Sequence, residues 1–320
     1  MREGVNPTLA SVRETGAFAL RTPKDHGGSW ETATVIAQTL AELGRSDPAA
    51  AWVAGTCLTG KTLAARSFGP AGAERVFADP DSLFCGSGSP TGRGEPGPDG
   101  IRLTGRWANI SGCLDADWAV LGALVGGTFS LVAVPLTDLT IDRTWDMAGM
   151  RDTESHSVVA ADVLVPADLV APLRLPGDPA DMTLFGLSVL APVVGATFGA
   201  LDLIDAMFAS DRKPYLTSYA SMGESPGARH WLAQATHLAG RAERTMLAVA
   251  EGAPGTGMEL ADAARDCRSA VDLMLDLHGA SGFAMANPLQ RFWRDVAVGS
   301  RHPHLNPYLA VERFTVPSGS

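Results

Sequence analysis

The sequence has few cysteines and no excess of positive charge, and each of these gaps excludes a class of protein. The four cysteines are Cys57, Cys85, Cys113 and Cys267, and no two of them form a CxxC pair. Their spacing therefore signals neither a zinc site nor a redox pair. The formal net charge of −10 argues against nucleic acid or an anionic membrane surface as a partner.

Sequence signals for secretion and nucleotide binding are also missing. Residues 1–4 have no apolar stretch of the kind found in a signal peptide, so we expect a cytoplasmic protein. There is no Walker loop, and no GxGxxG follows a predicted strand. The longest apolar run, residues 184–201, has the length of a membrane span. Amphipathic helices follow it, which favours a buried helix of a bundle and no membrane partner.

What the sequence does contain is enough apolar residues for a large core. Hydrophobic residues make up 46% of the 320 residues, which suffices for one large domain or for two to three packed subdomains. Between residues 31 and 76 apolar side chains recur at helical spacing, and Asp47-Pro48 marks the start of a second helix there. We assign residues 1–80 to an N-terminal helical domain.

A β-domain is predicted over residues 81–172 and a helical bundle over residues 180–320. From Ser82 onward, glycine and proline are frequent, and short apolar runs alternate with turn residues. Further along, helices are predicted at about 182–209, 226–252 and 258–278. The run Gly195–Gly199 in the first of these helices predicts close packing against another helix.

The C-terminal part carries the most informative motif. It reads His278-Gly279-Ala280-Ser281-Gly282-Phe283, followed by Pro288, Arg291–Asp295 and His302. This order resembles the last helix-turn-helix of the acyl-CoA dehydrogenase superfamily, in which a "GG-x-G-F" turn helps to hold the flavin phosphates. The resemblance assigns Gly279, Gly282 and Arg294 to cofactor binding.

The position of the catalytic base distinguishes the branches of that superfamily. Straight-chain dehydrogenases carry a glutamate eight residues past the aspartate that matches Asp295, and here Pro303 stands there. Proline cannot abstract a proton, whereas the neighbouring His302 can donate or accept a hydrogen bond near neutral pH. Several monooxygenase relatives have histidine at the His302 position, which makes it the candidate catalytic residue. An exposed histidine without a catalytic role is the alternative.

A second motif, Gly105–Gly112, resembles the "G-x-W-x-x-x-S-G" segment of two-component flavin monooxygenases. The resemblance assigns Trp107, Asn109, Ser111 and Gly112 to the flavin site, with the Ser111 hydroxyl close to flavin N5 and thus in a catalytic role. Asn109 departs from the pattern, because relatives carry an aromatic side chain there and asparagine offers little stacking area. We therefore expect reduced flavin to bind more tightly than oxidised flavin.

Two further stretches extend the resemblance. Gly86–Gly92 lies where the superfamily has a loop beside the flavin pyrimidine edge, which assigns Ser89 to the cofactor; a flexible β-turn is the alternative. Trp145–Val158 resembles "G-M-R-x-T-G-S-x-x-V", which makes Arg151 and Ser155 candidate substrate contacts. Glu154 replaces the usual glycine of that motif and adds a negative charge.

Together the motifs imply an α+β, acyl-CoA dehydrogenase-like fold with N-terminal helices, a central β-domain and a C-terminal four-helix-type bundle. They imply a flavin-dependent monooxygenase, of hydroxylase or N-oxygenase type, that acts on a small organic or biosynthetic intermediate. Its cofactor would be reduced flavin, FMN or FAD, used together with O2. A separate flavin reductase would be a transient partner, and a homodimer or homotetramer is expected. No metal site is predicted.

Two other functions remain open at this level. The first is an acyl-CoA or acyl-carrier dehydrogenase with a relocated base, for which Glu154 and Glu312 are the candidate carboxylates. The second is a flavin-free, non-redox relative of the same fold. The second is favoured somewhat by Asn109, by Glu154 and by the few residues that precede the Thr22–Gly28 turn, which resembles the superfamily's "P-x-x-x-GG" turn. In relatives a longer helical domain precedes that turn.

Overall fold

The computed structural model describes residues 7–175, 177–253 and 257–315, and these divide into two compact units. The first unit comprises the described parts of residues 1–36, 52–147 and 151–184. The second comprises residues 37–51 and 148–150 and the described part of residues 185–320. Each unit is described by itself, because each has its own core.

The first unit combines helices with a mixed sheet. Its helices are α1 (Pro7–Glu14), most of α3 (Pro48–Ser67) and α4 (Pro70–Val76). The Asp47 carboxylate accepts a hydrogen bond from the Ala50 N–H at 3.0 Å, which caps the start of α3 as the Asp-Pro pair predicted. Lys61 of α3 is fully buried, and its ammonium donates to the Phe18 and Pro80 carbonyls and to the Thr22 hydroxyl.

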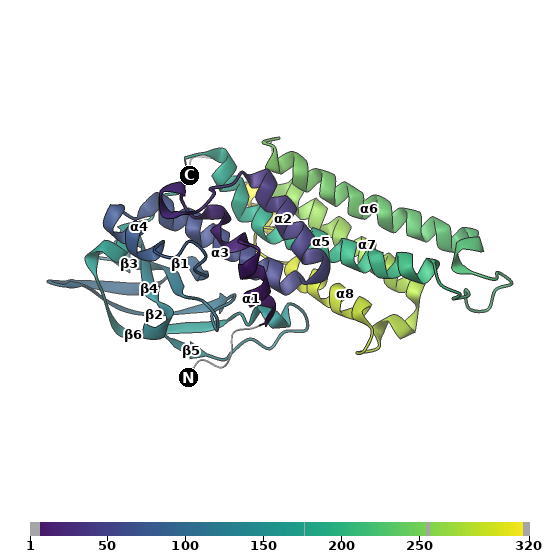
Figure 1. Ribbon diagram of the computed structural model, residues 1–320, viewed down its shortest axis with the longest axis horizontal. Coiled ribbons are helices and arrows are strands. Elements are labelled where there is room, and N and C mark those ends of the chain that lie inside the picture. Colours follow the sequence, from purple (N-terminus) through teal and green to yellow (C-terminus); the bar gives the residue numbers. More distant parts are fainter. Residues whose placement is uncertain (1–6, 176, 254–256, 316–320) are drawn as a thin grey trace. The chain divides into compact units, whose positions relative to one another are not determined.

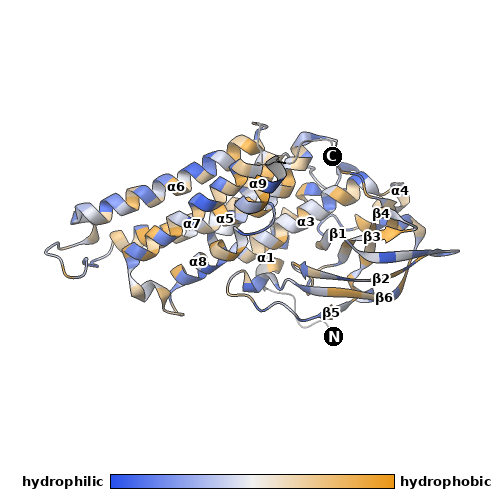
Figure 2. Cartoon of the chain, turned by 180° about the vertical axis from the view of Figure 1, so that it is seen from behind, coloured by the Kyte–Doolittle hydropathy of each residue, from blue (hydrophilic) through white to orange (hydrophobic). Residues whose placement is uncertain are grey.

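The sheet follows the apolar runs of the sequence. Within the described residues it has seven strands in the order β5-β6-β2-β1-β3-β4-β7, and Figure 1 shows most of them labelled. Only the β1–β3 pairing is parallel. The strands are β1 (Phe84–Gly97), β2 (Gly100–Ile110), β3 (Trp118–Val125), β4 (Thr128–Pro135), β5 (Thr140–Asp142), β6 (His156–Val165) and β7 (Val170–Pro172). Figure 2 shows apolar residues concentrated on β3 and β4, where side chains of both strands are buried.

The glycine-rich stretch 86–97 is the main departure from the strands expected in this domain. It forms most of β1, whereas the sequence suggested a loop at Gly86–Gly92. The alternative of a flexible turn is wrong for Gly86, Ser87 and Gly92, because these residues pair with β3. Between Ser87 and Gly92 the ladder to β3 is interrupted. Glycine is needed here because a Cβ at Gly92 would overlap the indole ring of Trp107. Close packing, more than turn formation, therefore explains several of these glycines.

The second unit is a helical bundle. It contains most of α5 (Pro179–Phe208), together with α6 (Pro226–Ala250), α7 (Gly257–His278), α8 (Pro288–Gly299), α9 (Pro307–Thr315) and most of α2 (Ala33–Ser46). The long helices α5, α6 and α7 run side by side in Figure 1. Ser225 caps α6, and Asn287 caps α8 through its side chain, with proline at the first helical position of both. These bounds confirm the three helices predicted from periodicity to within a few residues.

Small residues let α5 and α2 pack closely. A Cβ at Gly195 would overlap the Ala41 carbonyl, and one at Gly199 would overlap the carbonyl of Arg45. The Arg45 guanidinium adds two hydrogen bonds of 2.6 Å to the Asp202 carboxylate. The glycine run in α5 therefore serves helix packing, as predicted. By length and composition α5 could cross a membrane, but 89% of its most apolar window is buried inside the chain.

Candidate functional site

The strongest candidate in the first unit is a chain of three buried hydroxyls at the end of β2. The Ser111 Oγ lies 2.8 Å from the Ser155 Oγ, and that atom lies 2.7 Å from the Thr153 Oγ1. The exposed fractions of Ser111, Ser155 and Thr153 are 8%, 3% and 1%. The structure brings Ser155, the candidate substrate contact, next to Ser111, and its contact with substrate stays a prediction.

Gly112 holds the two segments of this cluster together. Its N–H donates to the Thr153 carbonyl at 2.8 Å. Its φ of +73° is in the region that favours glycine, and a Cβ there would approach the Val53 side chain. The small residue after Ser111 is thus required by the backbone, whatever ligand the site takes.

Trp107 and Asn109 lie on the same strand in different settings. The Trp107 ring is 1% exposed, and its Nε1 donates to the Gly122 carbonyl at 2.9 Å. Trp107 therefore belongs to the core of the first unit. Asn109 is exposed at an interruption of the β2–β6 ladder, with φ of +60°. Asparagine tolerates that conformation better than bulky residues do, which gives a structural reason for the missing aromatic side chain.

The β1 segment places Ser89 at the surface. Residues 88–91 lie in the interruption of the β1–β3 ladder, and the Ser87 hydroxyl accepts a hydrogen bond from the Ser89 N–H at 3.2 Å. Ser89 is exposed. Backbone groups that leave a sheet ladder are available to a ligand that approaches closely, so the assignment of Ser89 to the cofactor stays a prediction that this geometry accommodates.

Glu154 is engaged with a neighbouring histidine. Its carboxylate lies 2.7 Å from the Nε2 of His156, while the Nδ1 of His156 accepts the Trp145 N–H at 3.0 Å. The hydrogen of the neutral ring therefore sits on Nε2 and points to Glu154. This pairing engages one of the two carboxylates, Glu154 and Glu312, that the dehydrogenase alternative would use as a base. Arg151 is exposed and lies 3.8 Å from Asp146.

In the second unit, two sequence motifs meet. The Met150 N–H donates to the buried Asp295 carboxylate at 2.5 Å, and a Cβ at Gly149 would overlap the Arg294 carbonyl. The Gly-Met pair of one motif thus packs on the Arg-Asp pair of the other. Among the described residues, no hydrogen bond or ion pair involves the Arg294 guanidinium, which leaves it able to bind an anion.

The turn after α7 is held by a network around His278. Its Nε2 lies 3.2 Å from Arg212 Nη1 and 3.1 Å from Asn287 Nδ2, and its Nδ1 lies 3.3 Å from Ser281 Oγ. Burial first, and then the Arg212 charge, lower the pKa of His278. Gly279 has φ of +77° with open space where a Cβ would stand, whereas Gly282 packs against Leu275 and His278. Gly279 is therefore the accessible glycine of the turn.

His302 lies just past α8 in a stack of rings. The ring centroids of His302 and His304 are 5.4 Å apart, and that of Phe185 lies 6.4 Å beyond His304. The His304 N–H also donates to the Nδ1 of His302 at 3.3 Å. His302 is half-buried, so the structure does not support the alternative of an exposed histidine. His304 contacts His302 directly, so a change at His304 also affects His302.

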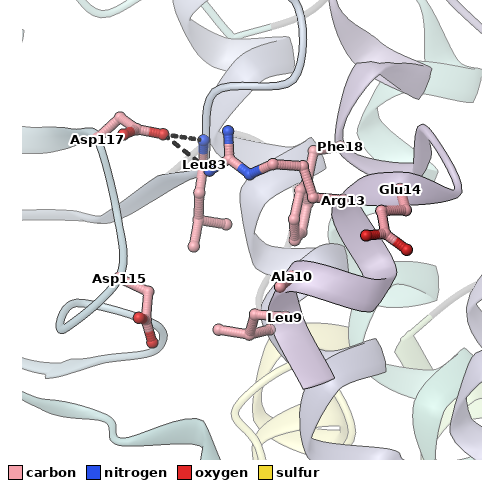
Figure 3. Close-up of a pocket in the computed structure, with 8 residues that line it drawn as sticks. All are labelled: Leu9, Ala10, Arg13, Glu14, Phe18, Leu83, Asp115 and Asp117. Carbon is pink, nitrogen blue, oxygen red and sulfur yellow. Dashed lines mark hydrogen bonds and ion pairs between the residues drawn. The ribbon is translucent and has the colours of Figure 1, made fainter. Parts of the chain in front are cut away.

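Other reactive groups of the described chain offer no competing site. Burial raises the pKa of the Cys113 thiol to about 11 and that of Cys267 to about 12, which keeps both thiols protonated. No group of three or more metal-ligating side chains occurs among the described residues. A cavity of about 460 Å³ lies in the first unit. Figure 3 shows the residues that line it, among which Asp117 bonds to Arg13 and to the Leu83 N–H. The cavity is lined by none of the predicted site residues.

Comparison with known proteins agrees with this picture. Residues 187–307 match the family described as acyl-CoA dehydrogenase, C-terminal domain. The oxygenase subunit HsaA of a flavin-dependent monooxygenase from Rhodococcus jostii (strain RHA1) is 27% identical, over 96% of this chain and 89% of that protein. The oxygenase component of an FADH(2)-dependent resorcinol hydroxylase from Rhizobium sp. (strain MTP-10005) is 27% identical, over 93% of this chain and 83% of that protein. XiaF from Streptomyces sp., solved with FADH2 and glycerol, superposes with a TM-score of 0.88 at 27% identity, covering 97% of this chain and 87% of that one.

The fold and these matches define the class first: the chain is similar to proteins of the acyl-CoA dehydrogenase superfamily, whose C-terminal domain matches residues 187–307. Within that class, the relatives that the chain resembles over most of its length are named as flavin-dependent monooxygenases or as their oxygenase components, as its motifs predicted.

Sequence reasoning missed two features of the site. It gave Thr153 no role, although Thr153 and Ser155 are hydroxyl residues of the same motif. It also overlooked Arg212, which lies far along the chain from His278 and carries no local signal. Only the fold brings such residues together.

Proposed function

We propose that the protein is the oxygenase component of a two-component flavin-dependent monooxygenase. It acts on a small organic molecule, with reduced flavin and O2. The observation that carries this proposal is the Ser111 hydroxyl at the end of β2, held by Ser155 in a segment that matches the monooxygenase motif. The relatives named as flavin-dependent monooxygenases, across nearly the whole chain, support it.

The residues present fit a flavin. Ser111 offers a hydroxyl that can donate to or accept from a ring nitrogen. The backbone of residues 88–91, outside the β1–β3 ladder, offers polar groups to a pyrimidine edge. The positively charged Arg294 and the open side of Gly279 suit an anionic phosphate. The chemistry that a bound reduced flavin would supply is two-electron activation of O2, with one oxygen atom going to the substrate and the other to water.

The chain's own contribution is to position groups and to control hydrogen bonds. His302 accepts the His304 N–H at Nδ1, so the hydrogen of its neutral ring lies on Nε2. It would then donate a hydrogen bond to the substrate or to the reacting oxygen, rather than accept a proton there. Ser111 would hold the cofactor edge, and Arg151 would meet the substrate from the surface.

Two partners complete the proposal. A flavin reductase delivers reduced flavin transiently, as the two-component relatives imply. A homodimer or homotetramer is also proposed. The apolar α5 is mostly covered within its own chain, so it gives no reason for a partner copy. The bundle instead exposes Tyr215, Leu216 and Met285, which are 89%, 88% and 74% accessible. We place this enzyme in the cytoplasm and in a biosynthetic role.

Visible spectroscopy tests the proposal directly. The purified protein is titrated with FMN and FAD, oxidised and then reduced under anaerobic conditions, and afterwards mixed with ¹⁸O-labelled O2 and a panel of phenols, amines and thioethers. Saturable binding of reduced flavin and incorporation of one labelled atom are expected. Binding of neither flavin in either redox state would overturn the assignment and leave the non-redox alternative. Binding with substrate desaturation instead would favour the dehydrogenase.

A further inference from the structure

The hydroxyl chain Ser111–Ser155–Thr153 has a property that a single serine lacks. Each hydroxyl has one hydrogen to donate, so a chain of three can point its hydrogens in either direction. The distances of 2.8 and 2.7 Å are hydrogen-bond lengths, and all three side chains are buried. Water therefore cannot replace Ser155 as the neighbour of Ser111 without opening the cluster.

We propose that Ser155 is a positioning residue that lets Ser111 act as an acceptor toward reduced flavin and as a donor toward oxidised flavin. This inference rests on the proposed function and deepens it. Reduced flavin carries a hydrogen on N5, whereas oxidised flavin presents a lone pair there. Ser111 must therefore reverse its role between the two states.

The hydrogen bonds of the three hydroxyls can run in two directions, and Ser155 has a different role in each. When Ser111 accepts from the cofactor, its own hydrogen goes to Ser155 Oγ, and the hydrogen of Ser155 goes to Thr153. When Ser111 donates to the cofactor, Ser155 only fills a lone pair of Ser111. A buried donor without an acceptor costs more than an acceptor with a spare lone pair. Loss of Ser155 therefore weakens the reduced state selectively.

The experiment measures the affinity of both redox states. In Ser155→Ala, the Kd of reduced flavin is expected to rise about tenfold, while the Kd of oxidised flavin changes by less than about threefold. The midpoint potential of the bound flavin then falls by at most about 30 mV, since 29.6 mV corresponds to tenfold for two electrons. Thr153→Val removes the next acceptor and shifts the ratio in the same direction by less.

A matched control and a double variant complete the design. Ser130 is another buried serine of the first unit, 3% exposed, and its hydroxyl donates to the Thr128 carbonyl on β4. Ser130→Ala should leave the ratio of the two Kd values unchanged. Ser111→Ala/Ser155→Ala should show no redox selectivity beyond that of Ser111→Ala, because the effect acts through Ser111.

The outcomes separate this inference from the function on which it rests. If the wild type binds no flavin, the proposed function fails. If the wild type binds flavin but Ser155→Ala and Thr153→Val both keep the wild-type ratio of Kd values, the function stands and the positioning role of Ser155 is wrong. Equal weakening of both redox states would also overturn it, since that result indicates a merely structural role. Circular dichroism checks that each variant folds.

Discussion

Candidate residues form one part in each unit, and the two parts are held by different forces. In the first unit, Ser111 is fixed by neutral, buried hydroxyls on a strand end. In the second, the turn at Gly279 and the segment from Arg294 to His302 are held by a guanidinium, a buried carboxylate and stacked rings. A neutral, water-free setting suits the edge of an uncharged ring system, whereas a cationic and partly exposed one suits phosphate.

The largest effect on activity is expected from a change of His302 in the second part. His302→Ala should lower oxygen transfer by roughly two orders of magnitude, the usual contribution of a positioned acid–base or hydrogen-bonding group. Coupled turnover with reduced flavin is measured for an accepted substrate. His237→Ala, which changes an exposed histidine on α6, is the control and should behave as wild type. Full coupled activity in His302→Ala would remove it from the catalytic machinery.

The next effect concerns stability in the second part alone. Gly149→Ala should lower the free energy of unfolding by about 1–3 kcal/mol, because the added methyl group overlaps the Arg294 carbonyl and disturbs the Met150–Asp295 hydrogen bond. Denaturant unfolding gives this value. Gly223→Ala is the matched change, since its Cβ would have only one atom within 4 Å, at 3.9 Å. If both variants unfold alike, the close approach at Gly149 has no energetic weight.

A smaller effect tests whether the second part binds the anionic end of the ligand. Arg294→Gln should weaken flavin binding about tenfold, since a charge-assisted hydrogen bond is lost. The loss should shrink as salt is raised, because mobile ions screen the guanidinium. Affinity is measured by fluorescence quenching at several ionic strengths, and Ser155→Ala should show no such salt dependence. An affinity that is the same in Arg294→Gln at low salt contradicts this role.

The ring stack gives a subtler prediction. His304→Ala should reduce oxygen transfer by less than about tenfold, because it removes the ring that orients His302 but keeps the His302 imidazole. His304→Phe retains a stacking ring and should recover most of the activity. Nitrogen chemical shifts in a protein labelled on its seven histidines report the tautomer of His302 without any flavin. Hydrogen on Nδ1 of His302 would contradict the bond from the His304 N–H.

The smallest effect is a pH dependence confined to the turn. The pKa of His278 is lowered in the folded state from its ordinary value of 6.5. The unfolded chain therefore takes up the proton first, and stability present above pH 6.5 declines as the pH falls below it. Thermal unfolding at pH 7.5 and 5.5 should show a larger drop for the wild type than for His278→Gln, which keeps an acceptor. Equal drops would exclude a contribution from His278.

Sequence patterns predicted most of the fold for identifiable reasons. Apolar side chains recur with the period of the element in the helices α5, α6 and α7 and in the strands β2, β3, β4 and β6. Such periodicity can be read from the sequence because each element buries one face. β1 was largely missed, because glycines such as Gly92 carry no strand pattern and are explained only by the ring packed against them. The short strands β5 and β7 are three residues each, too brief for a periodic signal.

By itself, the sequence determined the fold class and the kinds of residue at the candidate site, since motif spacing constrains both local backbone and chemistry. The tertiary structure alone decided the partners of those residues. It placed Ser155 on Ser111, Phe185 beside His304 and Asp295 on Met150, across separations that no periodicity encodes. The physical reason is that a hydrogen bond or a ring contact needs side chains within a few ångströms, and only the folded chain sets such distances between residues far apart in sequence.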